Sequence, residues 1–399
     1  MMDMDTDTYR FIARAFLEYY NYITTKKRYT EVRDLDKREL AFTYFMSHGM
    51  VRHLKINNFS KIIDYMKRDV INNLYMSAAI YRYPDADSMG SKYRLGTDFV
   101  IDIDVDHIDT PCKKEHDWWQ CTKCGVKGKG MPPAKCPKCG GESFKTFKWI
   151  CDKCLNVAKN EILTLFDSFF NKFAIDNRDI EIHFSGQRGY HVLVMSDEFR
   201  GLDQLGRSEL VDYLLRTDTE TSLKLLVRDL ENNIDNMKYI RNKYRLRKDS
   251  VLKIIENKDD ILQIVRKRPK RFAYLVNKIL DFTEILINIH LDIPVSIDVH
   301  RLIRMKHSLH GKTGMVVYNI GVSKYELNKF DPFSDAIPSV FIAKPDVPIR
   351  ILQDIPKIRI LDRVYGPYSA NMKDKVSYPA AVFLIAKGVA KIEKKGIIS

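Results

Sequence analysis

The chain has 399 residues, of which 45% are hydrophobic and 30% are charged, a composition typical of one large or two ordinary globular domains. Lysine and arginine (66) exceed aspartate and glutamate (52), and the net charge of +14 favours a polyanionic partner such as nucleic acid. No apolar run approaches the roughly 20 residues of a membrane-spanning helix, and the acidic start MMDMDTDTYR is unlike a signal peptide. We therefore expect a soluble, intracellular protein of the cytoplasm or nucleoid, with no membrane partner.

The first hundred residues predict a mixture of helices and strands. The chain begins with apolar residues at loosely helical spacing, and residues 43–56 are more strand-like. Residues 60–76 return to a helical pattern. The segment RLGTDFVIDIDV (94–105) then alternates between apolar and acidic residues, which predicts a half-buried strand with one acidic face.

The acidic face of that strand is a candidate metal site. Asp102 and Asp104 project from the same face and can bind divalent ions, Mg²⁺ or Mn²⁺, through carboxylate oxygens. Two such ions can stabilise both the attacking and the leaving oxygen of a displacement. An ordinary exposed strand is the alternative. However, four acids within 98–106 are more than solubility requires, since like charges on one strand face repel.

All seven cysteines lie between residues 112 and 154, in a segment without apolar periodicity. In an intracellular protein, such clustering predicts metal binding in preference to disulfides. Two CxxC pairs are spaced like a tetrahedral zinc ribbon: Cys121, Cys124, Cys136 and Cys139. The other three cysteines can form a second four-ligand site with a nearby histidine: Cys112, His116, Cys151 and Cys154. We expect an inserted module with one or two structural zinc ions, an iron–sulfur cluster being the alternative.

A helix is predicted at 157–173, followed by two strands joined by the loop SGQRGYH (185–191). Its glycines allow close backbone approach. Arg188 can grip phosphate oxygens with two nitrogens, and His191 and the Ser185 hydroxyl can add hydrogen bonds. A hairpin turn with surface charges is the alternative interpretation.

Residues 200–290 have a helical pattern and carry two basic clusters, at 238–248 and 266–271. These clusters are either solvated faces or phosphate-contacting surfaces. Short strands and loops follow Asp292, with the basic turn His310-Gly-Lys312 among them. This turn is not a Walker motif, because residue 306 is Lys where the P-loop spacing requires glycine. It can contact phosphate, or it can be an ordinary basic turn.

Taken together, four segments resemble the small catalytic subunit of archaeal and eukaryotic DNA primases, and most closely an archaeal member. They are RELAF (38–42), DIDVD (102–106), SGQRGYH (185–191) and DIPVSIDVHRLIRMKHSLHGKTG (292–314). The resemblance implies an α/β (α+β) fold with a mixed-sheet catalytic core, an inserted zinc-binding module and a helical insertion. We divide the chain accordingly into core parts and insertions: core 1–110, zinc-binding module 111–154, core 155–199, helical insertion 200–285 and core 286–399.

The resemblance also assigns site residues by position. The catalytic, metal-binding aspartates are Asp102, Asp104 and Asp292. Asp292 is selected over Asp298 because it precedes a V-[ST] strand and lies 18 residues before the motif histidine. The nucleotide-binding residues are Ser185, Arg188, His191, Arg304, His310 and Lys312. Eukaryotic relatives have a second arginine where this chain has Gln187. The family's zinc motif matches Cys112, His116, Cys151 and Cys154, whereas the role of the Cys121–Cys139 ribbon is not implied.

The implied activity is template-directed synthesis of short RNA primers, and possibly DNA primers, from nucleoside triphosphates on single-stranded DNA during replication. Two Mg²⁺ or Mn²⁺ ions and one or two zinc ions are the implied cofactors. A large regulatory subunit, forming a heterodimer within the primosome, is the implied partner. The alternatives are a repair polymerase that extends ends, a metal-dependent nuclease and a non-catalytic zinc-ribbon protein that only binds nucleic acid. The zinc module and the helical insertion favour the replicative subunit over the repair enzyme.

Overall fold

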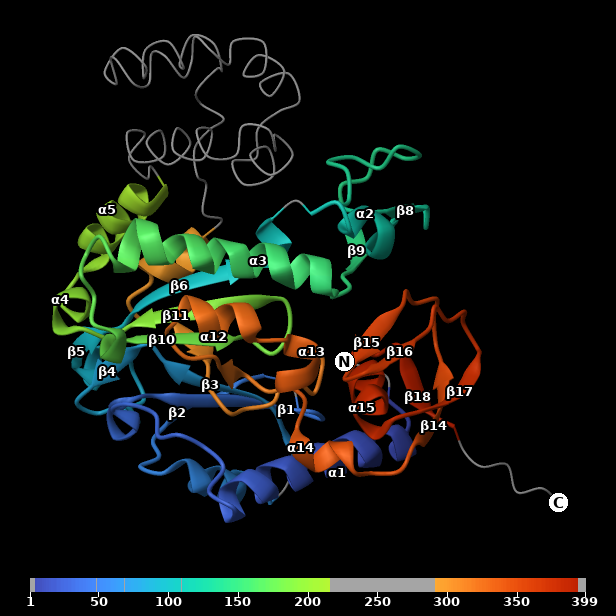
Figure 1. Cartoon of the computed structure of the whole chain (residues 1–399), viewed down its shortest axis with the longest axis horizontal. Helices are drawn as coiled ribbons and strands as arrows, with labels where there is room; N and C mark the ends of the chain where they lie inside the picture. The colour runs from blue at the N-terminus through green and yellow to red at the C-terminus, as the bar shows by residue number, and fades with distance from the viewer. Residues whose placement is uncertain (1–3, 48, 68, 109, 216–290, 394–399) are drawn as a thin grey trace, which may run out of the picture.

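A computed structural model of the chain describes residues 4–47, 49–67, 69–108, 110–215 and 291–393 (Figure 1). These residues form a mixed α/β fold, as the sequence predicted, but the strands of the two large sheets pair antiparallel where a mixed sheet was expected. The basic clusters at 238–248 and 266–271, and most of the predicted helical insertion, lie outside the described residues. None of the described helices combines the length and apolar composition needed to span a bilayer.

The first large sheet joins distant parts of the chain in the order β12-β3-β1-β2. Its strands are β1 (Leu40–Tyr44), β2 (Val51–Leu54), β3 (Ile71–Ser77) and β12 (Leu302–Arg304). Helix α1 (Thr6–Thr25) lies below this sheet in Figure 1, and the carboxylate of Asp5 caps it by accepting the Thr8 N–H (2.9 Å). The helix buries one face because its apolar side chains recur at three- and four-residue spacing: Ile12, Ala15, Phe16, Tyr19 and Ile23.

The helical pattern predicted for residues 60–76 is wrong in its second half. A 3-10 helix, η2, covers Phe59–Met66, but Ile71–Ser77 is strand β3. That strand is central in its sheet and pairs with β1 on one side and with β12 on the other. Pairing with strands so distant in sequence overrides a local pattern.

The second large sheet has the order β13-β10-β11-β6 and carries the acidic strand. Its strands are β6 (Phe99–Asp104), β10 (Ile180–Phe184), β11 (Gly189–Val194) and β13 (Tyr318–Asn319). The predicted alternation in β6 is confirmed, because Ile101 and Ile103 are fully buried while Asp102 and Asp104 are partly exposed.

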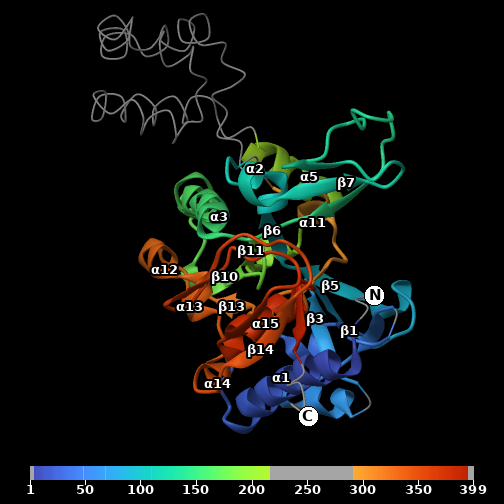
Figure 2. The ribbon, with the colours of Figure 1, turned by 90° about the vertical axis from the view of Figure 1, so that its right-hand side faces the viewer.

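Helix α3 and the segment after it cover the apolar face of this sheet. Helix α3 (Asp152–Leu165) continues into a π-helical turn, η5 (Phe166–Phe170), and packs on β6 and β11 (Figures 1 and 2). The ring of Phe169 lies 6.1 Å from that of Phe99, which shares a strand face with Ile101 and Ile103. Since successive strand residues point to opposite faces, Asp102 and Asp104 point away from α3.

The cysteine-rich segment forms a small sheet of its own, in the order β8-β7-β9. A short helix, α2 (Lys113–His116), precedes β7 (Trp118–Cys121), β8 (Lys127–Lys129) and β9 (Phe144–Phe147). This module projects from the edge of the molecule near the start of α3 (Figure 1). It has no extended apolar pattern because its strands are only three or four residues long.

The C-terminal part forms a third packing unit against α1. A sheet of order β17-β14-β18 packs with helix α15 (Tyr378–Ala386), every residue of which is buried. The Ile392 N–H donates to the hydroxyl of Thr8 (3.1 Å), so the last strand closes on the first helix. The strands of this part are β14 (Val347–Ile351), β15 (Ile358–Ile360), β16 (Arg363–Tyr365), β17 (Lys373–Val376) and β18 (Ala390–Ile392).

Short elements complete the described fold. They are the hairpin β4 (Ala79–Tyr81) and β5 (Arg94–Thr97), and the helices α4 (Asp197–Arg200), α5 (Gln204–Leu215), α11 (Ile293–Ile297), α12 (Lys324–Lys329), α13 (Pro332–Asp335) and α14 (Ser339–Ile342). Four short helices, α11 to α14, therefore lie in the region after Asp292 where only short strands and loops were predicted, as far as the described residues show.

A buried ion pair joins the two large sheets. Arg38 and Asp98 are 1% and 0% exposed, and Arg38 Nη2 lies 2.6 Å from Asp98 Oδ2. Arg38 also donates to the carbonyls of Ser77 (2.9 Å) and Ala78 (3.1 Å), directly after β3. Arg200 Nε donates to the other oxygen of Asp98 (2.7 Å). One carboxylate at the start of β6 thus anchors β1, β3 and helix α4.

Replacing this carboxylate should destabilise the fold strongly. Asp98→Ala leaves Arg38 buried without a counter-charge, whereas Arg200 keeps its ion pair with Asp34 (3.2 Å), so we expect a loss of about 3–5 kcal/mol in the free energy of unfolding. Urea denaturation followed by circular dichroism measures the loss. Asp176→Ala is the control, because its partner Arg178 is exposed and the pair should contribute little. Similar losses in the two variants would contradict the anchoring role.

Candidate active site

Three aspartates from two elements meet at one end of the second sheet. Asp102 and Asp104 lie on β6, and Asp292 is the N-cap of α11, where its carboxylate accepts the Val295 N–H (3.4 Å). The Asp292 N–H donates to the carbonyl of Asp102 (3.0 Å), which fixes the third carboxylate beside the first. The V-[ST] segment after Asp292 was expected to be a strand, and this is wrong. Val295 and its neighbours are helical because Asp292 caps the turn and a proline occupies its first positions.

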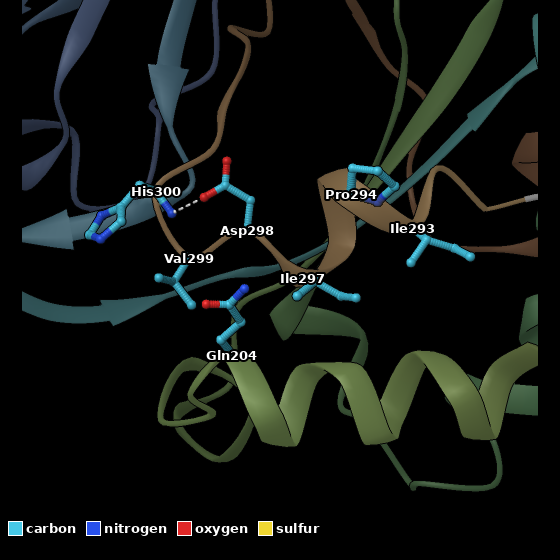
Figure 3. Close-up of a pocket in the computed structure, with 7 residues that line it drawn as sticks. All are labelled: Gln204, Ile293, Pro294, Ile297, Asp298, Val299 and His300. Atoms are coloured by element: carbon cyan, nitrogen blue, oxygen red, sulfur yellow. Dashed lines mark hydrogen bonds between the residues drawn. The ribbon is translucent and has the colours of Figure 1, made fainter.

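Asp298, the rejected alternative, lies at the opposite end of α11. Its carboxylate accepts the N–H of His300 (2.8 Å), and it lines a pocket of about 330 Å³ beside α5 (Figure 3). The other lining residues are Gln204, Ile293, Pro294, Ile297, Val299 and His300. Asp292 is therefore the carboxylate that the structure brings beside Asp102 on β6.

The aspartates repel one another in a partly buried setting. Burial, together with repulsion from Asp292, raises the pKa of Asp102 to about 6. Burial and repulsion from Asp106 and Asp102 likewise raise the pKa of Asp104 to about 6. A nearby cation stabilises the charged form of such carboxylates. Oxygen ligands in this number suit Mg²⁺ or Mn²⁺, which keep waters and substrate oxygens in their coordination shells.

The aspartates do not form a closed cage. Among the described residues, only the cysteine-rich clusters bring three or more potential ligand atoms all within 4.8 Å of one another. An ion at Asp102, Asp104 and Asp292 would therefore draw on further oxygens from water or substrate. This open arrangement is typical of sites in which a metal binds protein and phosphate together.

Asp106, next in the acidic motif, belongs to a different set of contacts. It forms ion pairs with Lys148 and with Nε of Arg188 (2.8 Å for the latter). Burial alone would raise its pKa, but Arg188 and Lys148 hold the pKa below its usual value. Its charge is thus already balanced by protein cations.

His191 lies directly opposite Asp102 in the pairing of β11 with β6. Its Nε2 is 3.5 Å from Oδ1 of Asp102. Burial, with repulsion from His183 and Arg304, lowers the pKa of His191 to about 3, so the ring is neutral at physiological pH. Its Nδ1 is buried and has no hydrogen-bond partner among the described residues. His191 can therefore offer a hydrogen bond, but not a charge, to a bound group.

The SGQRG turn presents Arg188 in a more restricted way than the sequence suggested. Arg188 is 3% exposed, with Nε facing Asp106 and Nη2 at 3.5 Å from Asp117. The sequence predicted that two nitrogens of Arg188 grip a phosphate. The structure does not show this arrangement, because carboxylates of the protein already face two of the three guanidinium nitrogens. Within the described chain, Nη1 is buried without a partner and is the nitrogen left for a ligand.

The HGK turn packs directly on the SGQRG turn. Gly186 has φ +81°, and a Cβ there would lie 2.7 Å from Cβ of His310, so a larger residue would both strain the backbone and separate the turns. The Thr313 hydroxyl donates to the carbonyl of Gly186 (2.5 Å). The structure thus brings the two predicted phosphate-binding turns together.

Arg304, His310 and Lys312 reach the site from the strand and loop after α11. His310 is buried, and its pKa lies well below the usual value because of burial and of repulsion by Arg304 and Lys312. Its Nδ1 accepts the N–H of Lys312 (3.0 Å), while the Lys312 side chain is exposed. Arg304 and Lys312 thus disfavour a positive charge on His310. Such a concentration of basic groups is typical of a site that binds an anion.

Sequence reasoning missed three residues that organise this site. Asn73 Oδ1 accepts from Arg304 Nη1 (2.6 Å) and from the N–H of Gly311 (3.0 Å). Asp117 faces both Arg188 and His116. Burial and repulsion from Arg188 and Lys312 lower the pKa of Lys387 to about 7. The contacts of Asn73 with Arg304, of Asp117 with Arg188 and of Lys387 with the phosphate-binding turns join distant segments, so no local pattern could have identified them.

The cysteines form two four-ligand clusters with the partition that the sequence predicted, and both could hold zinc. In the first, Sγ of Cys154 lies 3.2 Å from Sγ of Cys112 and 3.2 Å from Nε2 of His116. In the second, the sulfur pairs Cys121–Cys139 and Cys124–Cys136 are each separated by 3.6 Å. The first cluster comprises Cys112, His116, Cys151 and Cys154, and the second Cys121, Cys124, Cys136 and Cys139.

The first cluster is coupled to the active site through Asp117. Oδ1 of Asp117 lies 2.7 Å from Nδ1 of His116, and its Oδ2 faces Arg188. A carboxylate on the second nitrogen of a metal-binding histidine orients the ring. The same carboxylate therefore positions a cluster ligand and a candidate phosphate contact.

Comparisons with known proteins agree with this geometry. Residues 147–322 match the family model described as "DNA primase small subunit". The chain is 30% identical over 389 residues to DNA primase small subunit PriS of Archaeoglobus fulgidus, covering 96% of this chain and 98% of that protein. It is 28% identical over 372 residues to the protein of the same name from Thermoplasma volcanium, covering 91% of this chain and 95% of the relative. For the corresponding protein of Cenarchaeum symbiosum, the identity is 26% over 382 residues, with 94% and 95% covered.

Repulsion among the aspartates should make the metal-free protein less stable as the pH rises. A carboxyl whose folded-state pKa is raised binds its proton more tightly in the folded state than in the unfolded state. Its contribution to folding stability is therefore fully present below about pH 4 and is lost as the pH rises through about 6. Asp102→Asn removes one of these charges. In EDTA at pH 7.5 we expect it to raise the thermal midpoint by roughly 2–5 °C, with a smaller gain at pH 4.5.

Calorimetry with and without 10 mM MgCl₂ completes this test. Mg²⁺ should stabilise the wild type at pH 7.5 and stabilise Asp102→Asn much less. An Asp102→Asn protein that is less stable than the wild type in EDTA would show that the carboxylate serves packing instead.

Proposed function

Because the chain belongs to the DNA primase small subunit family, we propose that Asp102, Asp104, Asp292 and the basic side chains opposite them carry out its reaction. The protein is a catalytic primase subunit, a nucleotidyltransferase that makes primers for DNA replication. The observation that carries the residue assignment is the Asp292–Asp102 backbone hydrogen bond, which unites carboxylates from β6 and α11. The activity that we propose for this protein is template-directed synthesis of short RNA primers, and possibly DNA primers, on single-stranded DNA.

The aspartates are proposed to hold two Mg²⁺ or Mn²⁺ ions. Such ions supply stabilisation of the attacking 3′-oxygen and of the leaving pyrophosphate. The raised pKa values of Asp102 and Asp104 support this role, because a divalent cation relieves their mutual repulsion. Asp106 is left out, since Lys148 and Arg188 already balance its charge.

The opposite wall is proposed to bind the triphosphate. Arg304 and Lys312 supply positive charge, while the neutral rings of His191 and His310 supply hydrogen bonds. Preorganised donors of this kind stabilise the charge that develops on a transferring phosphoryl group. Ser185 lies in the same turn, but its hydroxyl already accepts the Gly189 N–H (3.2 Å). We assign Arg188 a single phosphate contact through Nη1, because its other nitrogens face Asp106 and Asp117.

Both cysteine clusters are proposed to bind structural zinc. Each cluster offers four protein ligands and leaves no position for substrate. The first would tie the segment after β6 to the start of α3, since Cys112 lies on one and Cys151 and Cys154 on the other. Through Asp117 it would also hold Arg188 in place.

Single-stranded DNA, nucleoside triphosphates and a large regulatory subunit are the proposed partners. The net charge of +14 and the cationic wall of the site support binding of the first two. A passive nucleic-acid-binding protein would not need Asp102, Asp104 and Asp292 close enough together to raise the pKa of two of them.

Substitution at the aspartates tests the assignment. Asp104→Asn and Asp292→Asn should lower incorporation of labelled nucleotide on unprimed single-stranded DNA by at least about 100-fold, because each removes a metal ligand. Binding of the DNA should persist. Asp298→Asn is the matched control, since it changes the same side chain at the other end of α11. The assignment fails if Asp104→Asn keeps its activity, or if Asp298→Asn loses as much as Asp292→Asn.

Metal analysis tests the zinc proposal. We expect two zinc ions per chain in the purified protein, and one in a Cys136→Ser variant that still synthesises primers. Cys154→Ser should lose the other ion and lower the thermal midpoint, because Cys154 is fully buried. One ion in the wild type that Cys136→Ser retains would exclude the second cluster, and a folded protein with none would exclude both.

A further inference from the structure

The small sheet of the cysteine-rich module has one face with a distinct composition. Paired residues on neighbouring antiparallel strands point to the same face. Trp118 pairs with Lys129 and Phe147, and Gln120 pairs with Lys127 and Lys145. We call this set the lysine face: Trp118, Gln120, Lys127, Lys129, Lys145 and Phe147. The opposite face contains Trp119 and Cys121, which are buried.

The lysine face is basic and accessible. Lys127, Lys129 and Lys145 are exposed, and within the described part of the chain none of them forms an ion pair. Its surroundings are basic too, since Glu142 is the one acidic residue between 118 and 148, against Lys123, Lys127, Lys129, Lys135, Lys138, Lys145 and Lys148. Glu142 pairs with Lys135 (3.5 Å), which is not on the lysine face.

Aromatic rings lie among these lysines. The half-buried rings of Trp118 and Phe147 stack with centroids 5.4 Å apart and planes inclined by 22°. Lys127 Nζ lies 5.3 Å from the Trp118 ring. Lysines that contact phosphates, next to rings on which bases can stack, form the usual surface for single-stranded nucleic acid.

The face is continuous with the active site. The ring of Phe147 also stacks with Trp149 (5.8 Å), and Lys387 Nζ lies 6.0 Å from the Phe147 ring. Lys387 in turn is close enough to Arg188 and Lys312 for their charges to contribute to lowering its pKa. Basic side chains therefore extend from the lysine face through Lys387 to Arg188 and Lys312.

We propose that the lysine face binds the single-stranded DNA template where it passes the active site, with phosphates on Lys127, Lys129 and Lys145 and a base on Trp118. This inference rests on the proposed function, since it supplies the template that is copied. A single strand fits better than a duplex, whose bases are already stacked and unavailable to Trp118. The template is also a better candidate for this face than the primer, because no primer exists before the first bond forms.

The test measures template binding directly, without synthesis. Zinc-loaded full-length protein is titrated into a fluorescein-labelled single-stranded oligonucleotide, and anisotropy is recorded between 50 and 300 mM NaCl. The triple variant Lys127→Ala/Lys129→Ala/Lys145→Ala should bind roughly tenfold more weakly or worse at the lower salt concentrations. Its slope of log K against log[salt] should be shallower by about 2, at roughly 0.7 for each lost phosphate contact. Zinc content and thermal midpoint should not change, because the three side chains are exposed.

A second triple variant, Lys61→Ala/Lys357→Ala/Lys375→Ala, removes the same charge from exposed lysines elsewhere and should leave the slope within about 1 of the wild type. Trp118→Ala should weaken binding at least about fivefold, and Trp118→Phe, which keeps a ring, less than about twofold. Unchanged binding by the first triple variant, or an equal loss in both triple variants, overturns the proposal. So does unchanged DNA binding with lost binding of the large subunit, which would assign the face to a protein partner. Asp104→Asn separates this outcome from failure of the proposed function, because it should bind template normally while it synthesises nothing.

Discussion

The buried ion pair between Arg38 and Asp98 is the contact on which the arrangement of the site depends. Asp102, Asp104 and His191 lie on the second large sheet, whereas Arg304 and the Asn73 that holds it lie on the first. The carboxylates and the cationic wall therefore face each other only if the two sheets keep their relative position. Arg38 provides this, because it binds Asp98 at the start of β6 and the carbonyls that follow β3. Burial makes the contact obligatory, since breaking it would leave an uncompensated charge.

Electrostatic frustration is concentrated where chemistry is proposed and is relieved elsewhere. Asp102 is repelled by Asp292 and repels Asp104, and burial, together with Arg304 and Lys312, keeps His310 neutral. Asp106 and Arg188, by contrast, neutralise each other, although they belong to the same sequence motifs. The unbalanced groups are those that a metal–triphosphate complex would satisfy. Asp117 connects Arg188 to the first cysteine-rich cluster, which gives this cluster a reason to lie beside the active site.

Much of the candidate site could be predicted because its chemistry is local. Strand alternation predicted the Asp102–Asp104 face, and cysteine spacing predicted the two clusters. The spacing that selected Asp292 agrees with its position beside Asp102, although the segment after it is a capped helical turn and not a strand. The second half of the predicted helix at 60–76 was wrong for a related reason. Residues 71–77 form a strand because they pair with residues 40–44 and 302–304. The periodicity of a short segment does not reveal partners that are distant in sequence.

Residue type, alternation and ligand spacing are properties of neighbours in the chain, so the sequence alone reveals them. Folding was needed to show which nitrogens of Arg188 are already occupied, because Asp106 and Asp117 approach it from segments about 70 to 80 residues away. The same holds for Asn73 beneath Arg304 and for Lys387 between the lysine face and the phosphate-binding turns. Contacts of this kind depend on how separate elements pack. Packing is set by the burial of whole faces, and the spacing of residues within any one segment does not reveal it.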